Sequence, residues 1–250
     1  MVEKEVKKNR NIQAAYLRGS LLYGSPLLGG VGDIDLVFIH ASQPPTDREI
    51  RMLTPDIFFD IEHHDLLLYK TPRELRQDPW FGPSLRDAVP LYDPRHLLDY
   101  TQSGVRSNFA FPENIQARSQ KLLSQARQFW LDRQTAPPQK IIRELPAFLS
   151  ALENALNAVA LLSGPPLAIR RLGLEFPFRA EQVNTPGLVV AVEHLLGAIN
   201  IPPNQLTSWL KEWSRAMKIL QDQTDQDAIL AELDTYLFSA MDGFIQNDTN

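Results

Sequence analysis

Two aspartates flank one apolar residue at the start of a strand-like stretch, and this pattern constrains the chain more than any other. Asp33 and Asp35 enclose Ile34, and an apolar run continues to Ile39. Because successive side chains of a strand point to opposite faces, the two carboxylates project from the same face. Two like charges at that spacing repel each other unless a cation lies between them. A hard cation with oxygen ligands, most simply Mg²⁺, satisfies this arrangement.

A glycine-rich segment precedes the two aspartates. Gly19 and Ser20 follow a short apolar stretch, and further glycines lead to Gly32. A glycine turn lets backbone N–H groups approach phosphate oxygens with no Cβ in the way, and Ser20 adds a hydroxyl donor. The alternative is a surface hairpin in which these residues serve only turn chemistry. The order and spacing of the two patterns favour a phosphate-binding turn followed by a metal-binding strand.

These segments together resemble the signature of the DNA polymerase beta-like nucleotidyltransferase superfamily. The resemblance covers roughly residues 10–100, and one departure is Gly32, where many members carry Ser. In that family the Gly-Ser turn holds a nucleotide triphosphate and the paired aspartates bind metal ions. The resemblance therefore implies that Gly19 and Ser20 bind the triphosphate, and that Asp33 and Asp35 hold two Mg²⁺ ions.

The family also carries a third acid on a later strand. The stretch 57–62 is rich in β-forming residues, and Asp60 fits the hydrophobic-acid-hydrophobic pattern best. Glu62 lies two residues later on the same face and stays the alternative, although a solvated position is the preferred interpretation for it. The predicted catalytic and metal-binding set is therefore Asp33, Asp35 and Asp60.

Local signals predict the remaining elements of the first half. They indicate helices at the charged segment 1–10, at 46–53 and from Thr71-Pro72 onward, an extended segment continuing through 66–69, and a last strand at 89–94. The helix at 46–53 is expected because Thr46 has Glu three positions later, which resembles a capping box.

Two pairs near these elements have a functional and a structural interpretation. His63 and His64 could contact phosphate or metal, but we expect them to mark the exposed end of a strand. Trp80 and Phe81 could stack on a nucleotide base, but a buried aromatic pair is the preferred interpretation.

Beyond about residue 105, strand signals fade and apolar residues recur at helical spacing. Stripes of this kind predict helices before the Pro137-Pro138 break, at 141–159, at 206–220 and at 230–244. The expected fold class is α+β: a nucleotidyltransferase-fold mixed β-sheet domain with helices over residues 1–104, followed by an all-α helical bundle over residues 105–250 that binds the acceptor.

Composition excludes several classes of function. A net charge of -5 over 250 residues argues against a protein whose main partner is bulk nucleic acid, and it disfavours an RNA acceptor. The absence of cysteine excludes disulfides and thiolate chemistry. No apolar stretch reaches membrane-spanning length, and the charged first ten residues do not resemble a signal peptide, so a cytoplasmic location is the default expectation.

The expected activity is transfer of a nucleoside monophosphate from a nucleoside triphosphate to an acceptor hydroxyl, with release of pyrophosphate. ATP is the common donor in such families, and the acceptor is a small molecule or a protein. Asp60 would bind the second ion and either accept the hydroxyl proton or hold the base that does so. The acceptor is expected between the sheet domain and the helical bundle. A homodimer that shares this cleft is a further alternative, although no interface motif predicts it.

Further residues are considered without being assigned. The aminoglycoside-modifying members of the superfamily, such as kanamycin nucleotidyltransferase, use a Glu of the helical domain as general base. Glu144 and Glu153 are candidates for that role, although a solvated or salt-bridged flank position is favoured for each. Four cationic residues that could contact the triphosphate are Arg18, Lys140, Arg170 and Arg171.

A non-catalytic alternative belongs to another class of function. Nucleotidyltransferase-fold antitoxins bind a helical toxin and are usually close to one small domain. This chain carries its own helical segment and all three acids, so an enzyme is preferred over a binding partner of the antitoxin type.

Overall fold

The computed structural model describes residues 1–23, 32–44, 46–135, 141–199 and 201–223. The chain forms two compact units. The first comprises the described residues of 1–68, 87–98 and 201–223, and the second comprises the described residues of 69–86 and 99–199. The predicted division at residue 104 into a catalytic and an acceptor-binding domain stays a prediction.

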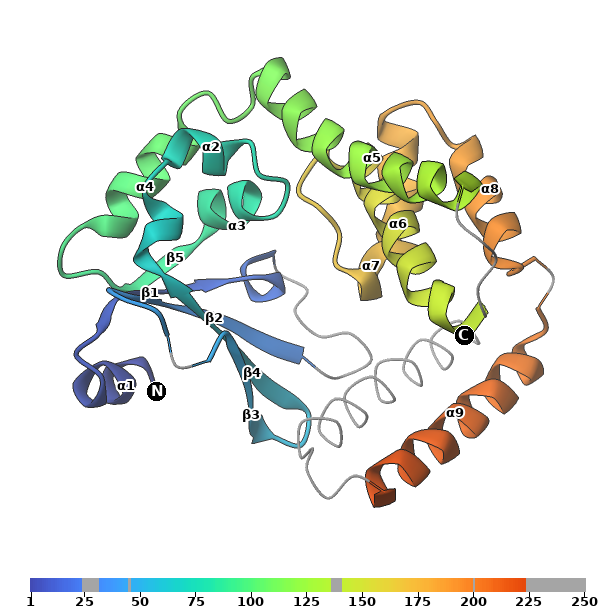
Figure 1. Cartoon of the computed structure of the whole chain (residues 1–250), viewed down its shortest axis with the longest axis horizontal. Coiled ribbons are helices and arrows are strands. Elements are labelled where there is room, and N and C mark those ends of the chain that lie inside the picture. The colour runs from blue at the N-terminus through green and yellow to red at the C-terminus, as the bar shows by residue number, and fades with distance from the viewer. Residues whose placement is uncertain (24–31, 45, 136–140, 200, 224–250) are drawn as a thin grey trace. The chain divides into compact units, whose positions relative to one another are not determined.

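A five-stranded mixed sheet forms the centre of the first unit (Figure 1). Its strands are β1 (Ile12–Arg18), β2 (Gly32–His40), β3 (Arg48–Thr54), β4 (Ile57–Asp65) and β5 (Val89–Tyr92). They lie in the order β3-β4-β2-β1-β5. Strands β2 and β4 are parallel, and each other pair of neighbours is antiparallel. The parallel pair occupies the middle of the sheet, where both predicted acid-bearing strands lie side by side.

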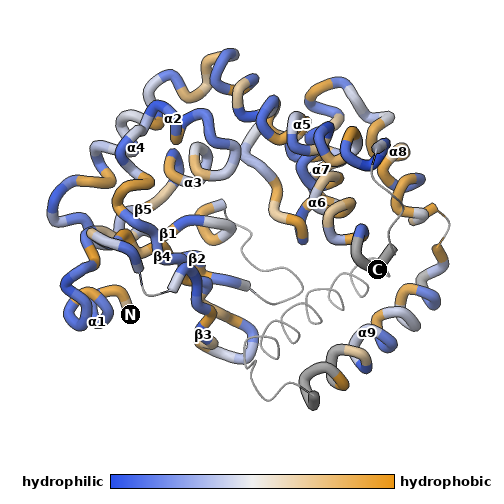
Figure 2. The backbone as a smooth tube through the Cα atoms, in the orientation of Figure 1, coloured by the Kyte–Doolittle hydropathy of each residue, from blue (hydrophilic) through white to orange (hydrophobic). Residues whose placement is uncertain are grey.

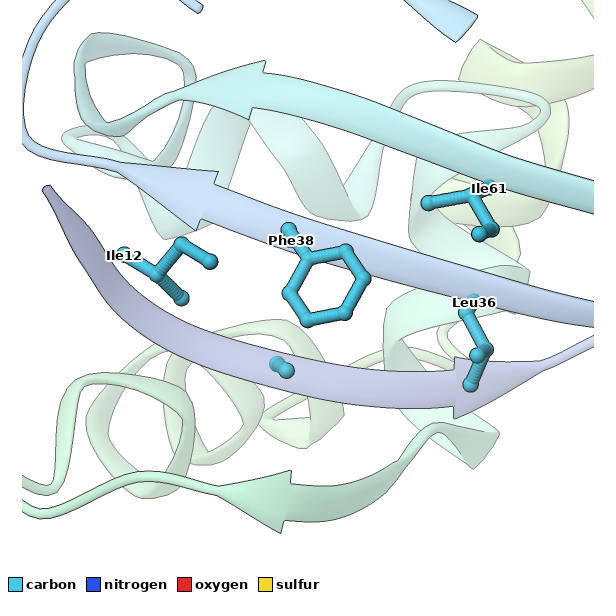
Figure 3. Close-up of a cluster of buried hydrophobic side chains, with 5 residues drawn as sticks. Ile12, Leu36, Phe38 and Ile61 are labelled. Atoms are coloured by element: carbon cyan, nitrogen blue, oxygen red, sulfur yellow. The ribbon is translucent and has the colours of Figure 1, made fainter. Parts of the chain in front are cut away.

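One face of this sheet forms an apolar core. Figure 3 shows Ile12, Leu36, Phe38 and Ile61 together on that face. Helix α1 (Val2–Lys8) packs against the cluster through two valines. The alternation that buries these side chains turns the odd-numbered residues of β2, which include both aspartates, to the opposite face.

Helices make up the second unit, and a further long helix follows it in the sequence. They are α2 (Pro72–Arg76), α3 (Phe81–Asp87), α4 (Leu97–Arg106), α5 (Pro112–Thr135), α6 (Ile141–Ala160), α7 (Ile169–Gln182), α8 (Gly187–Leu196) and α9 (Pro203–Gln223). Helices α5 and α6 pack through Leu122 and Ala158, together with Leu161, which follows α6 directly. Helix α8 is apolar along most of its length (Figure 2).

The predicted fold class, a mixed sheet followed by a helical region, is confirmed. The helices predicted at the N-terminus and from Thr71-Pro72 are present as α1 and α2, and the last predicted strand is β5. The helix predicted at 230–244 lies outside the described residues. No helix within the described ranges has both the length and the apolar character needed to cross a membrane.

The helix predicted at 46–53 is wrong, because this segment contains strand β3. The hydroxyl of Thr46 donates to the backbone oxygen of Arg48 at 3.1 Å instead of capping a helix. Residues from Arg48 onward pair with β4 in antiparallel register. The pairing with β4 therefore outweighs the local capping signal, as tertiary context often does.

Strand β4 ends earlier than predicted. Residues Leu66–Tyr69 form a 3₁₀ turn, in which Asp65 Oδ1 accepts a hydrogen bond of 2.7 Å from the backbone N–H of Leu67. A short polar side chain that binds the backbone two residues later favours a turn over an extended chain.

Two expectations about side-chain exposure are also wrong. His64 is buried, and the side chain of His63 is only 10% exposed, so this pair does not mark an exposed strand end. Trp80 is 40% exposed and is not part of a buried pair. Phe81 instead forms an edge-to-face contact with Tyr69, with 6.5 Å between ring centroids.

Candidate metal centre

Three carboxylates meet on the face of the sheet opposite the apolar core. Asp33 and Asp35 project from β2, and Asp60 projects from β4 directly beside Asp35 in the parallel register. One oxygen atom from each residue lies within 4.8 Å of the other two. Three convergent carboxylate oxygens are the ligand type that Mg²⁺ and Mn²⁺ prefer, so the donor set fits a hard divalent cation. The structure thus brings the three predicted acids together.

Asp35 lies at the electrostatic centre of this group. Burial raises the pKa of Asp35, and repulsion from Asp33 and Asp60 raises it further, while the charge of Arg18 opposes the shift. The pKa of Asp35 is about 7. Asp35 therefore keeps its proton to a higher pH than an ordinary carboxyl does, and a bound cation would favour the ionised form.

Asp60 is held by an arginine from the neighbouring strand. Arg48 Nε donates to Asp60 Oδ1 at 2.7 Å, and Arg48 Nη2 donates to Asp60 Oδ2. This fork-like pairing engages both carboxylate oxygens and fixes the orientation of the carboxyl group. Arg48 was not among the four cationic candidates predicted from the sequence.

Glu62, the alternative third acid, is engaged elsewhere. Arg18 Nη2 donates to Glu62 Oε1, and His64 Nε2 lies 3.0 Å from Glu62 Oε2. Burial raises the pKa of Glu62, but the hydrogen bond from His64 and the charge of Arg18 outweigh it and lower the pKa to about 2. Glu62 is thus an ionised counter-charge to Arg18, whereas Asp60 faces the other two aspartates.

Gly19 lies directly against Asp35. Its φ of +83° is in the left-handed region, and a Cβ at this position would overlap Asp35 Oδ2. The turn that follows β1 can approach the carboxylate this closely only because Gly19 has no side chain. The glycine was predicted for its approach to phosphate, and its contact with Asp35 is an additional reason for glycine here.

Ser20 begins the 3₁₀ turn Ser20–Tyr23 that follows Gly19. The hydroxyl oxygen of Ser20 is buried, and no hydrogen-bond partner for it occurs among the residues that the structure describes. A buried hydroxyl without a partner is costly unless a ligand or water satisfies it. The glycine loop at residues 24–31 lies outside the described residues.

The remaining candidates belong to the second unit or lie outside the described residues. Within the second unit, Glu144 accepts a hydrogen bond of 2.7 Å from Arg133, and burial raises the pKa of Glu153. Arg171 pairs with Glu175 on the same helix at 3.1 Å. Lys140 lies outside the described residues.

Comparisons with known proteins do not identify a family for this chain. No family model matches the chain, and no curated protein matches it. A solved nucleotidyltransferase-like protein from Exiguobacterium sibiricum 255-15 is similar to this chain, with 14% identity and a TM-score of 0.36. The match covers 99% of this chain and 89% of that protein. A likeness at this level carries no argument about family, activity or substrate. The candidate site therefore rests on its own geometry.

Proposed function

We propose that the chain is a nucleotidyltransferase that moves a nucleoside monophosphate from a nucleoside triphosphate to an acceptor hydroxyl. The observation that carries this proposal is the convergence of Asp33, Asp35 and Asp60 beside the Gly19-Ser20 turn. The acceptor oxygen would form a bond to the α-phosphorus while the bond to the β-phosphate bridging oxygen breaks. The acceptor proton goes to a base, and pyrophosphate leaves.

In this proposal each site residue has a distinct task. Asp33, Asp35 and Asp60 would hold Mg²⁺, which supplies charge neutralisation and polarisation of the phosphate. Asp60 either takes the proton of the acceptor hydroxyl or holds the base that does so. Ser20 directs its buried hydroxyl to a phosphate oxygen, and Gly19 allows the backbone to approach.

The donor and the acceptor are proposed more broadly. ATP is the first donor to test, because it is the common donor among the proteins that the motif resembles. The acceptor is proposed to be a small molecule or a protein side chain. RNA is disfavoured, because the net charge of -5 is unsuited to phosphate neutralisation along a polynucleotide.

A nucleotide screen tests the proposal. The melting temperature is measured with each of the four nucleoside triphosphates, with Mg²⁺ and with EDTA, and the best binder is then supplied with an α-phosphate label and a panel of acceptors. We expect Mg²⁺-dependent stabilisation and label transfer, both lost in Asp35→Asn. Glu49→Gln, on the opposite face of the sheet, is the matched control and should retain both.

Two results would overturn the proposal. If no nucleotide raises the melting temperature in a Mg²⁺-dependent way, the chain has no donor site of the proposed kind. Nucleotide binding that is indifferent to Asp35→Asn would remove the role of the carboxylates, and would favour a non-catalytic binding partner of the antitoxin type.

A further inference from the structure

Both carboxylate oxygens of Asp60 already accept hydrogen bonds from Arg48. Asp60 is largely buried, with 13% of its side chain exposed, whereas Arg48 is 58% exposed. The guanidinium therefore reaches Asp60 from the solvent side. Strand β3, which carries Arg48, is an edge strand of the sheet. Because the arginine side chain is itself largely exposed, it can swing away into solvent and leave Asp60 accessible to a cation.

A divalent cation and a guanidinium compete for the negative charge of the same carboxylate. The remaining lone pairs of Asp60 could bind a cation, but the two positive charges repel each other at contact distance. The bidentate contact also holds the Asp60 carboxyl group in one orientation. A cation that uses Asp60 must therefore bind against the charge of Arg48 unless the arginine moves away.

We propose that Arg48 competes with a divalent cation for Asp60, so that the carboxylate group takes up cations in two unequal steps. This inference rests on the proposed function, because it assumes that the three aspartates bind cations. The first step uses the aspartates of β2. The second step uses Asp60 and requires Arg48 to move away. Arg48 is thus a positioning residue that sets how readily the site becomes fully loaded.

Strand β3 also supplies a matched control. Arg51 lies on the opposite face of the same strand, where Arg51 Nη2 donates to Glu49 at 2.6 Å and Arg51 Nη1 donates to Glu5 at 3.0 Å. Its removal changes the net charge by the same amount as removal of Arg48. A general electrostatic effect on cation binding would therefore appear in both variants, whereas competition for Asp60 would appear in one.

The experiment counts bound Mn²⁺ from the electron paramagnetic resonance signal of the free ion, in the full-length chain without nucleotide. The wild type should bind one ion more tightly than a second. Arg48→Met should strengthen the weaker step by roughly threefold to tenfold, the range expected for loss of a well-formed ion pair. Arg48→Lys, which keeps the charge without the fork, should lie between them. Arg51→Met should leave the isotherm unchanged.

A double variant shows whether the gain acts through Asp60. Asp60→Asn should weaken the second step, and adding Arg48→Met to it should restore no affinity, because the two changes act on one interaction. Melting curves of each variant establish that it is folded.

Each outcome separates the inference from the function on which it rests. If wild type and Arg48→Met bind Mn²⁺ equally, or if Arg51→Met gives the same gain, the competition is refuted while the metal centre stands. If none of the folded variants binds Mn²⁺, the proposed function fails and the inference fails with it.

Discussion

Both faces of the five-stranded sheet carry carboxylates, and the two faces satisfy them differently. On one face Asp33, Asp35 and Asp60 lie within 4.8 Å of one another, and mutual repulsion together with burial raises the pKa of Asp35 to about 7. Arg48 and Arg18 neutralise this region in part, but Arg18 is shared with Glu62.

On the opposite face, the charged groups form hydrogen-bonded ion pairs with one another. Glu49 accepts hydrogen bonds from Arg51 at 2.6 Å and from His63 at 3.0 Å, and these contacts lower its pKa although burial opposes the shift. Because Glu49 is ionised, His63 donates to it through Nε2, and a hydrogen bond of 2.9 Å joins His63 Nδ1 to His40 Nε2. Burial lowers the pKa of His40, which keeps it neutral.

The difference supports the proposal that the acid face binds a cation. A structural network supplies a counter-charge or a hydrogen bond for each ionised group. On the acid face three aspartates converge, and the repulsion among them raises the pKa of Asp35 although Arg18 opposes it. Local disagreement of this kind is expected at functional sites rather than in structural networks.

The largest expected effect concerns pH. The folded pKa of Asp35, about 7, lies above its usual 3.8, so the folded state binds this proton more tightly than the unfolded state. The contribution of Asp35 to stability is therefore lost as the pH rises through 7, on the order of 3 kcal/mol between about pH 5 and pH 8. Urea unfolding in EDTA measures it.

The control for this prediction is Asp35→Asn, because the wild type contains other groups that titrate. The lowered pKa of His40 acts in the opposite direction over the acid part of this range. The difference in unfolding free energy between wild type and Asp35→Asn should change with pH as described. A difference that is constant with pH would mean that Asp35 ionises as an ordinary surface carboxylate does.

The next effect concerns the turn that lies against the acid face. Gly19→Ala should lower the free energy of unfolding by about 2 kcal/mol or more, because a Cβ both strains the left-handed backbone and overlaps Asp35. Gly197→Ala is the control, since Gly197 has a φ of +67° but no atom within 4 Å of the added Cβ. It should cost only about 1 kcal/mol. Equal losses in a denaturation experiment would show that the crowding beside Asp35 is unimportant.

The smallest effect compares one carboxylate from each face. Glu49→Gln should lower the unfolding free energy by about 1 kcal/mol, because it removes the charge that holds Arg51 and His63. Asp60→Asn loses its pairing with Arg48 but relieves repulsion with Asp35, so in EDTA it should change stability by less than Glu49→Gln. A greater loss in Asp60→Asn would mean that the acid face is as well balanced as the other face.

The fold was predictable where the signal is local. The alternation of apolar and acidic residues in β2 depends only on adjacent positions, and it correctly placed Asp33 and Asp35 on one face. The capping pattern at Thr46 failed because the segment pairs with β4, and strand pairing is not visible in a short window.

The candidate site was likewise predictable where it depends on residues that are close in sequence, and not where it depends on contacts between distant segments. Asp60 was preferred over Glu62 from its neighbours in sequence, and the structure places it with the other two aspartates. The competing arginine was missed because its contact depends on the register between two strands, in which Ile50 lies opposite Asp60 and Arg48 reaches across diagonally. The pairing of Glu62 with Arg18 is likewise a contact between distant segments.

Anomalous diffraction from crystals soaked in Mn²⁺ tests the central claim most directly. The account predicts an anomalous peak on the acid face, within about 2.5 Å of carboxylate oxygens of both Asp33 and Asp35. No peak should occur beside Glu49 and His63, whose charges are satisfied within the protein. The account would be contradicted by saturating Mn²⁺ that leaves the three aspartates without a peak, or by aspartate side chains that point away from one another.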